Sequence, residues 1–212
     1  MIKVVAFDIG NTIYKVDKKN SILQKLSEML CLPKERVKIS YNKIFNVNNY
    51  SLEELCNMLC KDLNSTKVSE VLNFFKSLQI GSNAYEYVDK NLLNLIKEIK
   101  QSGVKVVLSS NSNILHKNLI EAKLASLVDD IFRTYEIGYQ KYEENYYRYI
   151  EKKLNVKPEE ILNIGDNELI DYQIPKSYGW QAVLFNCESG KIFNVQELKE
   201  ELKKYISFNW QT

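Results

Sequence analysis

Histidine, proline and glycine are scarce in this chain of 212 residues, which has one His, three Pro and seven Gly. With His116 as its single histidine, the chain cannot build a His-rich metal centre, and a nucleophile activated by a histidine base is not expected. The N-terminal segment MIKVVAFDIG is too short an apolar run for a membrane span or for the apolar region of a signal peptide. We therefore expect a cytoplasmic protein without a membrane partner.

The sequence also lacks paired cysteines and any concentration of charge. Its four cysteines, Cys31, Cys56, Cys60 and Cys187, do not have the spacing of a zinc site, and we expect reduced thiols that are buried as small apolar side chains. The 29 Lys and Arg residues nearly balance the 27 Asp and Glu residues, in short runs of mixed sign. No basic stripe stands out, so no nucleic-acid partner is expected.

Short β-branched apolar segments, separated by helical ones, are what the sequence does contain. The segment 3–8 has an apolar run, VVAF, without alternation, which is typical of a central parallel strand covered by helices on both faces. Further strands are expected at 105–109, 161–165 and 181–185, with a weaker candidate at 131–135. Helices are expected at 89–101, 113–127, 143–154, 169–178 and 195–205. This alternation predicts a doubly wound parallel sheet, that is, a Rossmann-like α/β core.

From about residue 15 to residue 84 the pattern changes to helices with no strand among them. Ser21–Gln24 and Ser51–Glu54 fit capping boxes, Pro33 fits a helix start, and residues 68–78 have apolar positions at helical spacing. We therefore expect two domains. Residues 1–14 and 85–212 would form the α/β core, and residues 15–84 would form an inserted α-helical cap domain.

Polar residues follow three of the expected strands. Ligands of open parallel sheets bind beyond the carboxyl ends of the strands, where the strand order reverses. At these ends the sequence has Asp8, then Ser110 and Asn111, then Asp166 with Asp171 five residues further on. Acids and hydroxyls that converge from separate strands suit an oxyanion held by a hard metal ion.

These residues resemble the four ordered motifs of the haloacid dehalogenase superfamily, over about residues 3–185. The motifs are a strand ending in D-x-x-x-T, a later strand ending in Ser or Thr, a downstream Lys, and a strand leading into G-D-x-x-x-x-D. The sequence supplies Asp8 with Thr12, Ser110 with Asn111, Lys141, and Gly165-Asp166 with Asp171. The helical insert falls where that family's C1-type cap lies. The resemblance implies a hydrolase of phosphate esters, with Mg²⁺ as its cofactor and a small phosphorylated metabolite as its substrate.

The resemblance also implies a role for each matched residue. Asp8 would attack phosphorus and form an aspartyl phosphate, Ser110 would bind a phosphoryl oxygen, and Lys141 would pair with the nucleophile and the phosphoryl charge. The phosphate would be bound by Ile9, Gly10, Ser110, Asn111 and Lys141. The metal would be held by Asp8, the backbone carbonyl of Gly10, Asp166 and Asp171.

Gly10 is the main departure from the family pattern. The family's phosphatases carry a second Asp there, which protonates the leaving oxygen and then activates water, and such general acid–base help is typically worth about 10²–10⁴-fold. A first hypothesis is a phosphatase that favours good leaving groups or takes its proton from the cap or from Asp17. A second is a catalytically impaired phosphate-binding or regulatory protein.

A third hypothesis for Gly10 is a phosphonoacetaldehyde-hydrolase-like enzyme, whose Schiff-base lysine would be Lys43 or Lys61 in the cap. We disfavour it because that branch has Arg where this chain has Lys141. Two smaller departures are Asn11, where the family usually has Gly, and Tyr142, where Pro usually follows the lysine. We expect packing roles, rather than substrate stacking, for the tyrosines at positions 139, 142, 146, 147 and 149.

Overall fold

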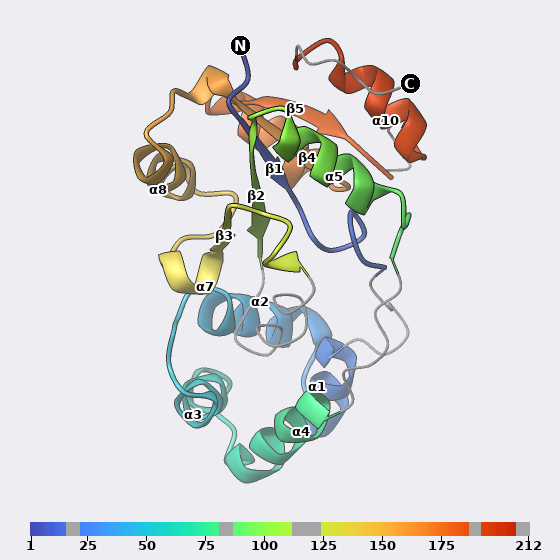
Figure 1. Ribbon diagram of the computed structural model, residues 1–212. Coiled ribbons are helices and arrows are strands. Elements are labelled where there is room, and N and C mark those ends of the chain that lie inside the picture. The colour runs from blue at the N-terminus through green and yellow to red at the C-terminus, as the bar shows by residue number, and fades with distance from the viewer. Residues whose placement is uncertain (16–21, 81–86, 112–123, 187–191, 207–212) are drawn as a thin grey trace.

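A computed structural model describes residues 1–15, 22–80, 87–111, 124–186 and 192–206 of the chain (Figure 1). Within these residues, five parallel strands form one sheet in the order β3-β2-β1-β4-β5. The strands are β1 (Val4–Phe7), β2 (Lys105–Ser110), β3 (Asp130–Arg133), β4 (Ile161–Gly165) and β5 (Gln181–Leu184). Because later strands add on both sides of β1, the order reverses there, and the predicted doubly wound α/β core is confirmed.

The register of β1 with its two neighbours determines where functional residues leave the sheet. Phe7 lies opposite Leu108 of β2 and opposite Ile164 of β4. The residues that follow these three positions therefore emerge at one edge of the sheet. Asp8, the last residues of β2 and the Gly165–Asp166 segment are brought together in this way.

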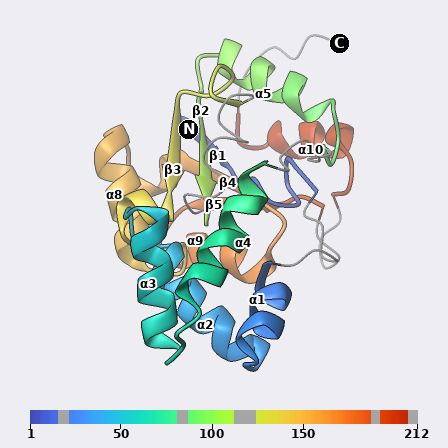
Figure 2. The ribbon, with the colours of Figure 1, turned by 90° about the horizontal axis from the view of Figure 1, so that it is seen from below.

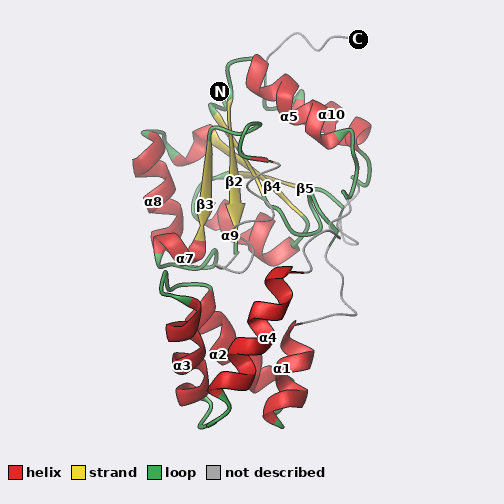
Figure 3. Ribbon diagram, turned by 60° about the horizontal axis from the view of Figure 1, so that its bottom comes forward, coloured by secondary structure: helices red, strands yellow, loops and turns green. Residues whose placement is uncertain are grey.

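Helices cover both faces of the sheet (Figure 3). They are α5 (Leu92–Gln101), α7 (Thr134–Ile137), α8 (Glu144–Leu154), α9 (Ile174–Ser177) and α10 (Val195–Leu202). Val5 and Phe7 share one buried cluster with apolar residues of α5 and α10. Val4 and Ala6 share another cluster with residues of α8. This alternation follows from the two-residue period of a strand, and it makes β1 the centre of the core.

Four further helices lie together at one end of the sheet (Figure 2). They are α1 (Ile22–Leu30), α2 (Lys34–Phe45), α3 (Leu52–Asp62) and α4 (Val68–Ile80). Their apolar faces form a buried cluster of their own, in which Phe45 packs against Phe75 with 4.9 Å between the ring centroids. Described residues 22–80 contain no strand, as the sequence predicts. The proposed domain boundaries at residues 15 and 84 stay a prediction.

The local signals in the insert agree with the sequence where they can be checked. The Ser51 hydroxyl accepts a hydrogen bond from the Glu54 backbone N–H at 3.3 Å, and the Glu54 carboxylate accepts one from the Ser51 N–H at 2.9 Å. This capping box starts α3 as expected, and Pro33 directly precedes α2. The other expected box, at Ser21, and most of the helix expected at 113–127 lie outside the described residues.

Two predictions about local structure need correction. The single helix expected over 169–178 is a π-helix over Glu168–Gln173 followed by α9. The expected burial of the cysteines is confirmed for Cys56 and Cys60 but is wrong for Cys31. That residue is exposed because it follows α1 at a positive φ of 54°, where the chain turns away from the packed face of the helix. Cys187 lies outside the described residues, and so does His116.

No helix among the described residues combines the length and the apolar character that a membrane crossing requires.

Candidate active site

Asp8 emerges from the central strand into a tight turn. Its backbone N–H donates to the Ile164 carbonyl at 2.8 Å, which ties the start of the turn to β4. The Ile9 carbonyl then accepts from the N–H groups of Ile13 and Tyr14, each at 3.0 Å. The Asp8 side chain is 13% exposed, and the buried Thr12 hydroxyl lies 3.5 Å from its Oδ2. Asp8 is thereby fixed at the carboxyl end of β1.

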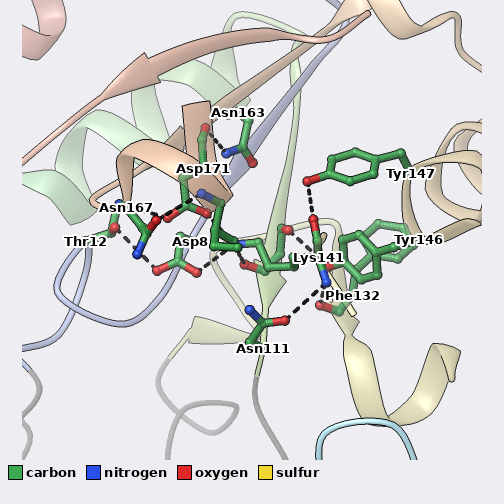
Figure 4. Close-up of polar contacts among 12 residues, drawn as sticks. Asp8, Thr12, Asn111, Phe132, Lys141, Tyr146, Tyr147, Asn163, Asn167 and Asp171 are labelled. Atoms are coloured by element: carbon green, nitrogen blue, oxygen red, sulfur yellow. Dashed lines mark hydrogen bonds and ion pairs between the residues drawn. The ribbon is translucent and has the colours of Figure 1, made fainter. Parts of the chain in front are cut away.

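The ammonium group of Lys141 lies between two carboxylates (Figure 4). Its Nζ is 2.9 Å from Asp8 Oδ1 and 2.6 Å from Asp171 Oδ1, and it also donates to the Ser109 carbonyl at 3.2 Å. These three bonds match the three donors of a lysine ammonium. Because the lysine side chain is only 2% exposed, such partners are needed to offset its desolvation. Lys141 therefore links Asp8, the candidate nucleophile, to Asp171, the last acid of the four motifs.

Lys141 is also held through its backbone. Its N–H donates to Asn111 Oδ1 at 3.3 Å, and its carbonyl accepts from the Tyr147 hydroxyl at 2.6 Å. The Tyr147 ring is buried and meets Trp180 edge-on, with 4.9 Å between the ring centroids. The loop thus has a fixed geometry, although Tyr142 occupies the position where the family usually has Pro.

Asp171 is positioned by the π-helix after β4, which is a type of turn that occurs frequently at functional sites. Its Oδ2 accepts from the Asn167 N–H at 3.1 Å, and its backbone carbonyl accepts from Asn163 Nδ2 at 2.7 Å. Gly165 allows this approach, because a Cβ at that position would overlap the Asp171 side chain. Both carboxylate oxygens of Asp171 are therefore engaged by protein donors.

Carboxylate oxygens of Asp8, Asp166 and Asp171 lie within 4.8 Å of one another. Three carboxylates face the single ammonium of Lys141, so the cluster carries excess negative charge when its acids are ionised. An all-oxygen donor set with this charge fits Mg²⁺, which prefers hard oxygen ligands and keeps several waters. Since Asp171 is already bound by Lys141 and Asn167, Asp8 and Asp166 are the better direct ligands. The residues present therefore fit the metal that the sequence resemblance implies.

The pKa values of the cluster reflect burial and mutual repulsion. Burial raises the pKa of Asp8 from 3.8 to about 7, with the Lys141 charge opposing the shift and the Asp171 charge adding to it. Burial, and then the Asp171 charge, also raise the pKa of Asp166. For Lys141, burial acts to lower the pKa, but Asp171 and Asp8 outweigh it and hold the value well above its usual range. A bound cation would favour the ionised acids by the same Coulombic effect.

The structure brings five of the predicted site residues together: Asp8, Asn111, Lys141, Asp166 and Asp171. The remaining three lie at the same edge of the sheet. Ser110 is the buried last residue of β2, Ile9 is buried, and Gly10 pairs with Tyr14 in an isolated bridge. No contact tests their role in phosphate binding, which stays a prediction.

The alternative proton donors and cap lysines are placed only in part. Asp17 lies outside the described residues. Lys43 forms an ion pair with Asp62 at 3.0 Å within the helical insert, and Lys61 is exposed in the last turn of α3. Neither lysine is placed in contact with the acid cluster, so the Schiff-base hypothesis gains no support from the described residues.

Several residues around the site were not predicted. Tyr146 and Tyr147 are buried as packing residues, as expected, but each hydroxyl also forms a hydrogen bond. The Tyr146 hydroxyl bonds Ser109 Oγ at 3.0 Å, and the Tyr147 hydroxyl bonds the Lys141 carbonyl. Asn163 could have been found, because a polar side chain in the middle of the apolar strand ILNIG needs a buried partner. The backbone donor of Asn167 and the carbonyl of Ser109 leave no signal in the sequence.

Comparisons with known proteins identify the family and the fold of this chain. A sequence model of the haloacid dehalogenase-like hydrolases matches residues 2–179. The Rhythmically expressed gene 2 protein of Drosophila melanogaster is 28% identical over 117 residues, which cover 53% of this chain and 45% of that protein. The chain thus spans about half the length of this curated relative.

Two enzymes of known structure share the fold of this chain. The HAD family enzyme bt-2542 from Bacteroides thetaiotaomicron superposes with a TM-score of 0.68 at 15% identity, covering 93% of this chain and 98% of that one. The L-2-haloacid dehalogenase of Xanthobacter autotrophicus gives a TM-score of 0.58 at 16% identity, covering 97% and 84%. At these identities the likeness shows the fold alone.

A doubly wound parallel sheet with an acid cluster and a buried lysine at its switch point is the α/β core of a HAD-type fold. Because the family match extends over most of its length, the chain belongs to the haloacid dehalogenase-like hydrolase family.

Proposed function

We propose that the protein is a Mg²⁺-dependent phosphohydrolase of a small phosphorylated metabolite, with Asp8 as the nucleophile. The observation that carries the proposal is the position of Lys141 Nζ, which contacts Asp8 at 2.9 Å and Asp171 at 2.6 Å beside a third acid, Asp166. A cluster of three acids around one cation is suited to a divalent metal and a phosphate. Displacement of a halide would not require a metal site, so the acids favour phosphate esters over haloacids.

The metal would be held by Asp8, Asp166 and the carbonyl of Gly10. Asp171 would stabilise the site through its ion pair with Lys141. When bound, Mg²⁺ supplies positive charge that offsets the charge of the phosphoryl oxygens. A structural neighbour supports this choice, because the enzyme bt-2542 from Bacteroides thetaiotaomicron has been solved in complex with magnesium and inorganic phosphate. The two chains are 14% identical and share the fold.

The residues of this chain would divide the reaction into two displacements. A carboxylate oxygen of Asp8 attacks phosphorus, the ester P–O bond breaks, and the substrate alcohol leaves as an anion that takes a proton from solvent. Water then attacks the aspartyl phosphate, and inorganic phosphate and free Asp8 result. Lys141 stays protonated and faces the developing charge, while Ser110, Asn111 and the backbone N–H groups of Ile9 and Gly10 bind phosphoryl oxygens.

Gly10 determines which substrates would react. With no acid at this position, alcohols that leave readily as anions are favoured, and poor leaving groups depend on a proton from elsewhere. The same observation supports a second candidate function, in which the chain binds a phosphorylated ligand as a regulatory protein with little turnover. In either case we propose that residues 15–84 act as a cap over the site.

Phosphate release from a panel of phosphate monoesters, with and without Mg²⁺, tests the proposal. The panel pairs good leaving groups, such as p-nitrophenol, with alkyl alcohols. We expect Mg²⁺-stimulated release that is abolished in Asp8→Asn and that is fastest with the good leaving groups. If Mg²⁺ stimulates release from none of the esters, the proposed enzyme activity is overturned. Binding of phosphate without turnover would then favour the second candidate function, that of a regulatory protein.

A further inference from the structure

A polar side chain, that of Asn163, lies in the middle of the buried apolar strand β4. The residue is 1% exposed, and its neighbours in the sheet are Ala6 of β1 and Ala182 of β5. Because neither alanine extends beyond its Cβ, the amide has space on this face of the sheet. A buried amide is costly unless it finds a hydrogen-bond partner, so the contact that Asn163 makes is of interest.

The amide of Asn163 points toward the backbone of Asp171 (Figure 4). Its Nδ2 donates to the Asp171 carbonyl at 2.7 Å. In an α-helix this carbonyl would accept from the N–H four residues later, but that residue is Pro175, which has no N–H. A side chain from the sheet therefore supplies a donor that the helix cannot offer at its usual position.

Asp171 has a protein partner for each of its polar groups. Its N–H donates to the Asn167 carbonyl at 2.8 Å, and its Oδ2 accepts from the Asn167 N–H at 3.1 Å. Its Oδ1 accepts from Lys141, and its carbonyl accepts from Asn163. Asn167 lies in the same turn as Asp171 and can shift with it. The bond to Asn163, by contrast, ties the Asp171 backbone to a strand in the interior of the sheet.

We propose that Asn163 is a positioning residue of the active site, which holds the backbone of Asp171 so that the Asp171 carboxylate keeps Lys141 aligned with Asp8. The inference rests on the proposed function and deepens it, since the same acids would hold the metal. Asn163 would act through Asp171 and not on the metal or the substrate itself. Outer groups that orient a metal site typically change metal affinity or activity by about 10–100-fold when they are removed.

Asn163→Ala tests the positioning role. Alanine removes the amide and adds no bulk to a row that already contains Ala6 and Ala182. We expect isothermal titration calorimetry of the full chain to show a Mg²⁺ Kd about 10-fold higher than in the wild type. In turnover assays at saturating Mg²⁺, kcat should fall while the substrate KM stays unchanged. Asn163→Val, which suits a buried strand and also lacks the donor, should give the same losses if the alanine variant does not fold.

Asn48→Ala is the matched control. The Asn48 amide also donates to a backbone carbonyl, that of Ile44 at 2.8 Å, but it does so at the end of α2 in the helical insert. Both substitutions remove one bond of the same kind, so we expect a lower thermal midpoint in both variants. Asn48→Ala should keep the wild-type Mg²⁺ Kd and kcat.

A second background separates positioning from a general effect on the fold. Asp171→Asn removes the carboxylate that bonds Lys141 but keeps the backbone carbonyl that accepts from Asn163. In this background we expect Asn163→Ala to lower the thermal midpoint again without a further change in the Mg²⁺ Kd. The carboxylate through which Asn163 acts would then already be absent.

The outcomes separate this inference from the proposed function. If the wild type binds no Mg²⁺, the proposed metal site fails, and the positioning role fails with it. If the wild type binds Mg²⁺ but releases no phosphate, the proposed hydrolase is overturned, and the Mg²⁺ Kd of Asn163→Ala still decides the positioning role. Wild-type affinity in Asn163→Ala would overturn that role while the metal site stands. A further loss of affinity in the Asp171→Asn background would also overturn it, because Asn163 would then act by another route.

Discussion

The ammonium of Lys141 lies 2.6 Å from Asp171 Oδ1, closer than the 2.9 Å that separates it from Asp8. The lysine is therefore anchored by an acid that is itself held by Asn163 and Asn167, and it reaches Asp8 from a fixed position. Such an arrangement would keep the cation in place both beside free Asp8 and beside the aspartyl phosphate that we propose.

Replacement of this lysine tests how strongly the buried ion pairs stabilise the fold. Lys141→Met leaves the buried carboxylate of Asp171 and the largely buried one of Asp8 without their cation, so we expect the free energy of unfolding in urea to fall by about 3–5 kcal/mol without metal. Added Mg²⁺ should restore part of this loss, because it supplies positive charge to the same acids.

Lys43→Met is the control for this prediction. The Lys43 side chain is 68% exposed and pairs with Asp62 at 3.0 Å, so its removal should change the free energy of unfolding by less than about 1 kcal/mol. Equal effects of the two substitutions would contradict the role assigned to the buried pairs.

Tyr147→Phe tests the hydrogen bond that holds the Lys141 backbone. The substitution removes the hydroxyl that donates to the Lys141 carbonyl at 2.6 Å and keeps the ring against Trp180. Loss of a buried bond of this kind costs about 1–3 kcal/mol, because the carbonyl loses its partner. We expect kcat for phosphate release to fall with little change in KM, since the lysine acts on the developing charge.

Tyr178→Phe is the matched control, because the Tyr178 hydroxyl makes a longer, exposed bond of 3.4 Å to the next carbonyl of the same loop, that of Tyr142. We expect its kcat to match the wild type. A similar fall in kcat for both variants would argue against a specific effect on Lys141.

Gly165→Ala tests the close approach between the end of β4 and Asp171. A methyl group at this position would overlap the Asp171 side chain, and overpacking typically costs about 1–3 kcal/mol. We expect weaker Mg²⁺ binding by calorimetry, because the acid must move away from Lys141. Gly103→Ala adds a methyl group in open space at a positive φ of 87°, so it should lose some stability but keep Mg²⁺ affinity. Normal Mg²⁺ affinity in Gly165→Ala would be inconsistent with the site described.

Gly10→Asp tests the missing proton donor. An acid two residues after the nucleophile would protonate the leaving oxygen, so we expect faster phosphate release from alkyl phosphates and little change with p-nitrophenyl phosphate. Rates should be compared as kcat/KM on both esters, with Gly10→Asn as a control of similar size that cannot donate from a carboxyl group. An unchanged rate on alkyl phosphates would mean that another residue already supplies the proton.

The sequence predicted the sheet and the main site residues because both leave local patterns. The segment 3–8 has an unbroken apolar run at 4–7, and Asp8, Asp166 and Asp171 follow the ends of expected strands, whereas Lys141 was identified only through the resemblance to the family motifs. The carboxyl ends of parallel strands must share an edge, so the positions of the three acids along the chain are enough to predict that they meet.

Other parts of the site depend on packing that has no local pattern. The contact of Tyr147 with Lys141 requires the docking of α8 on the sheet, and helical spacing alone identified this tyrosine only as a packing residue. The π-helix at Glu168–Gln173 has the composition of an ordinary helix, and the partners that hold its Asp171, Asn163 and Lys141, lie on other parts of the chain. Exposed Cys31 was misjudged because the left-handed turn after α1 has no glycine to mark it.

Formation of a phosphoryl-mimic adduct tests the central claim most directly. Trifluoroberyllate binds aspartyl nucleophiles as a mimic of the acyl phosphate, and ¹⁹F NMR detects the bound form. We predict a Mg²⁺-dependent adduct in the wild type that is absent from Asp8→Asn and weakened in Lys141→Met. A wild type that forms no adduct in the presence of Mg²⁺, or an adduct that persists in Asp8→Asn, would contradict the assignment of Asp8 as the phosphoryl acceptor.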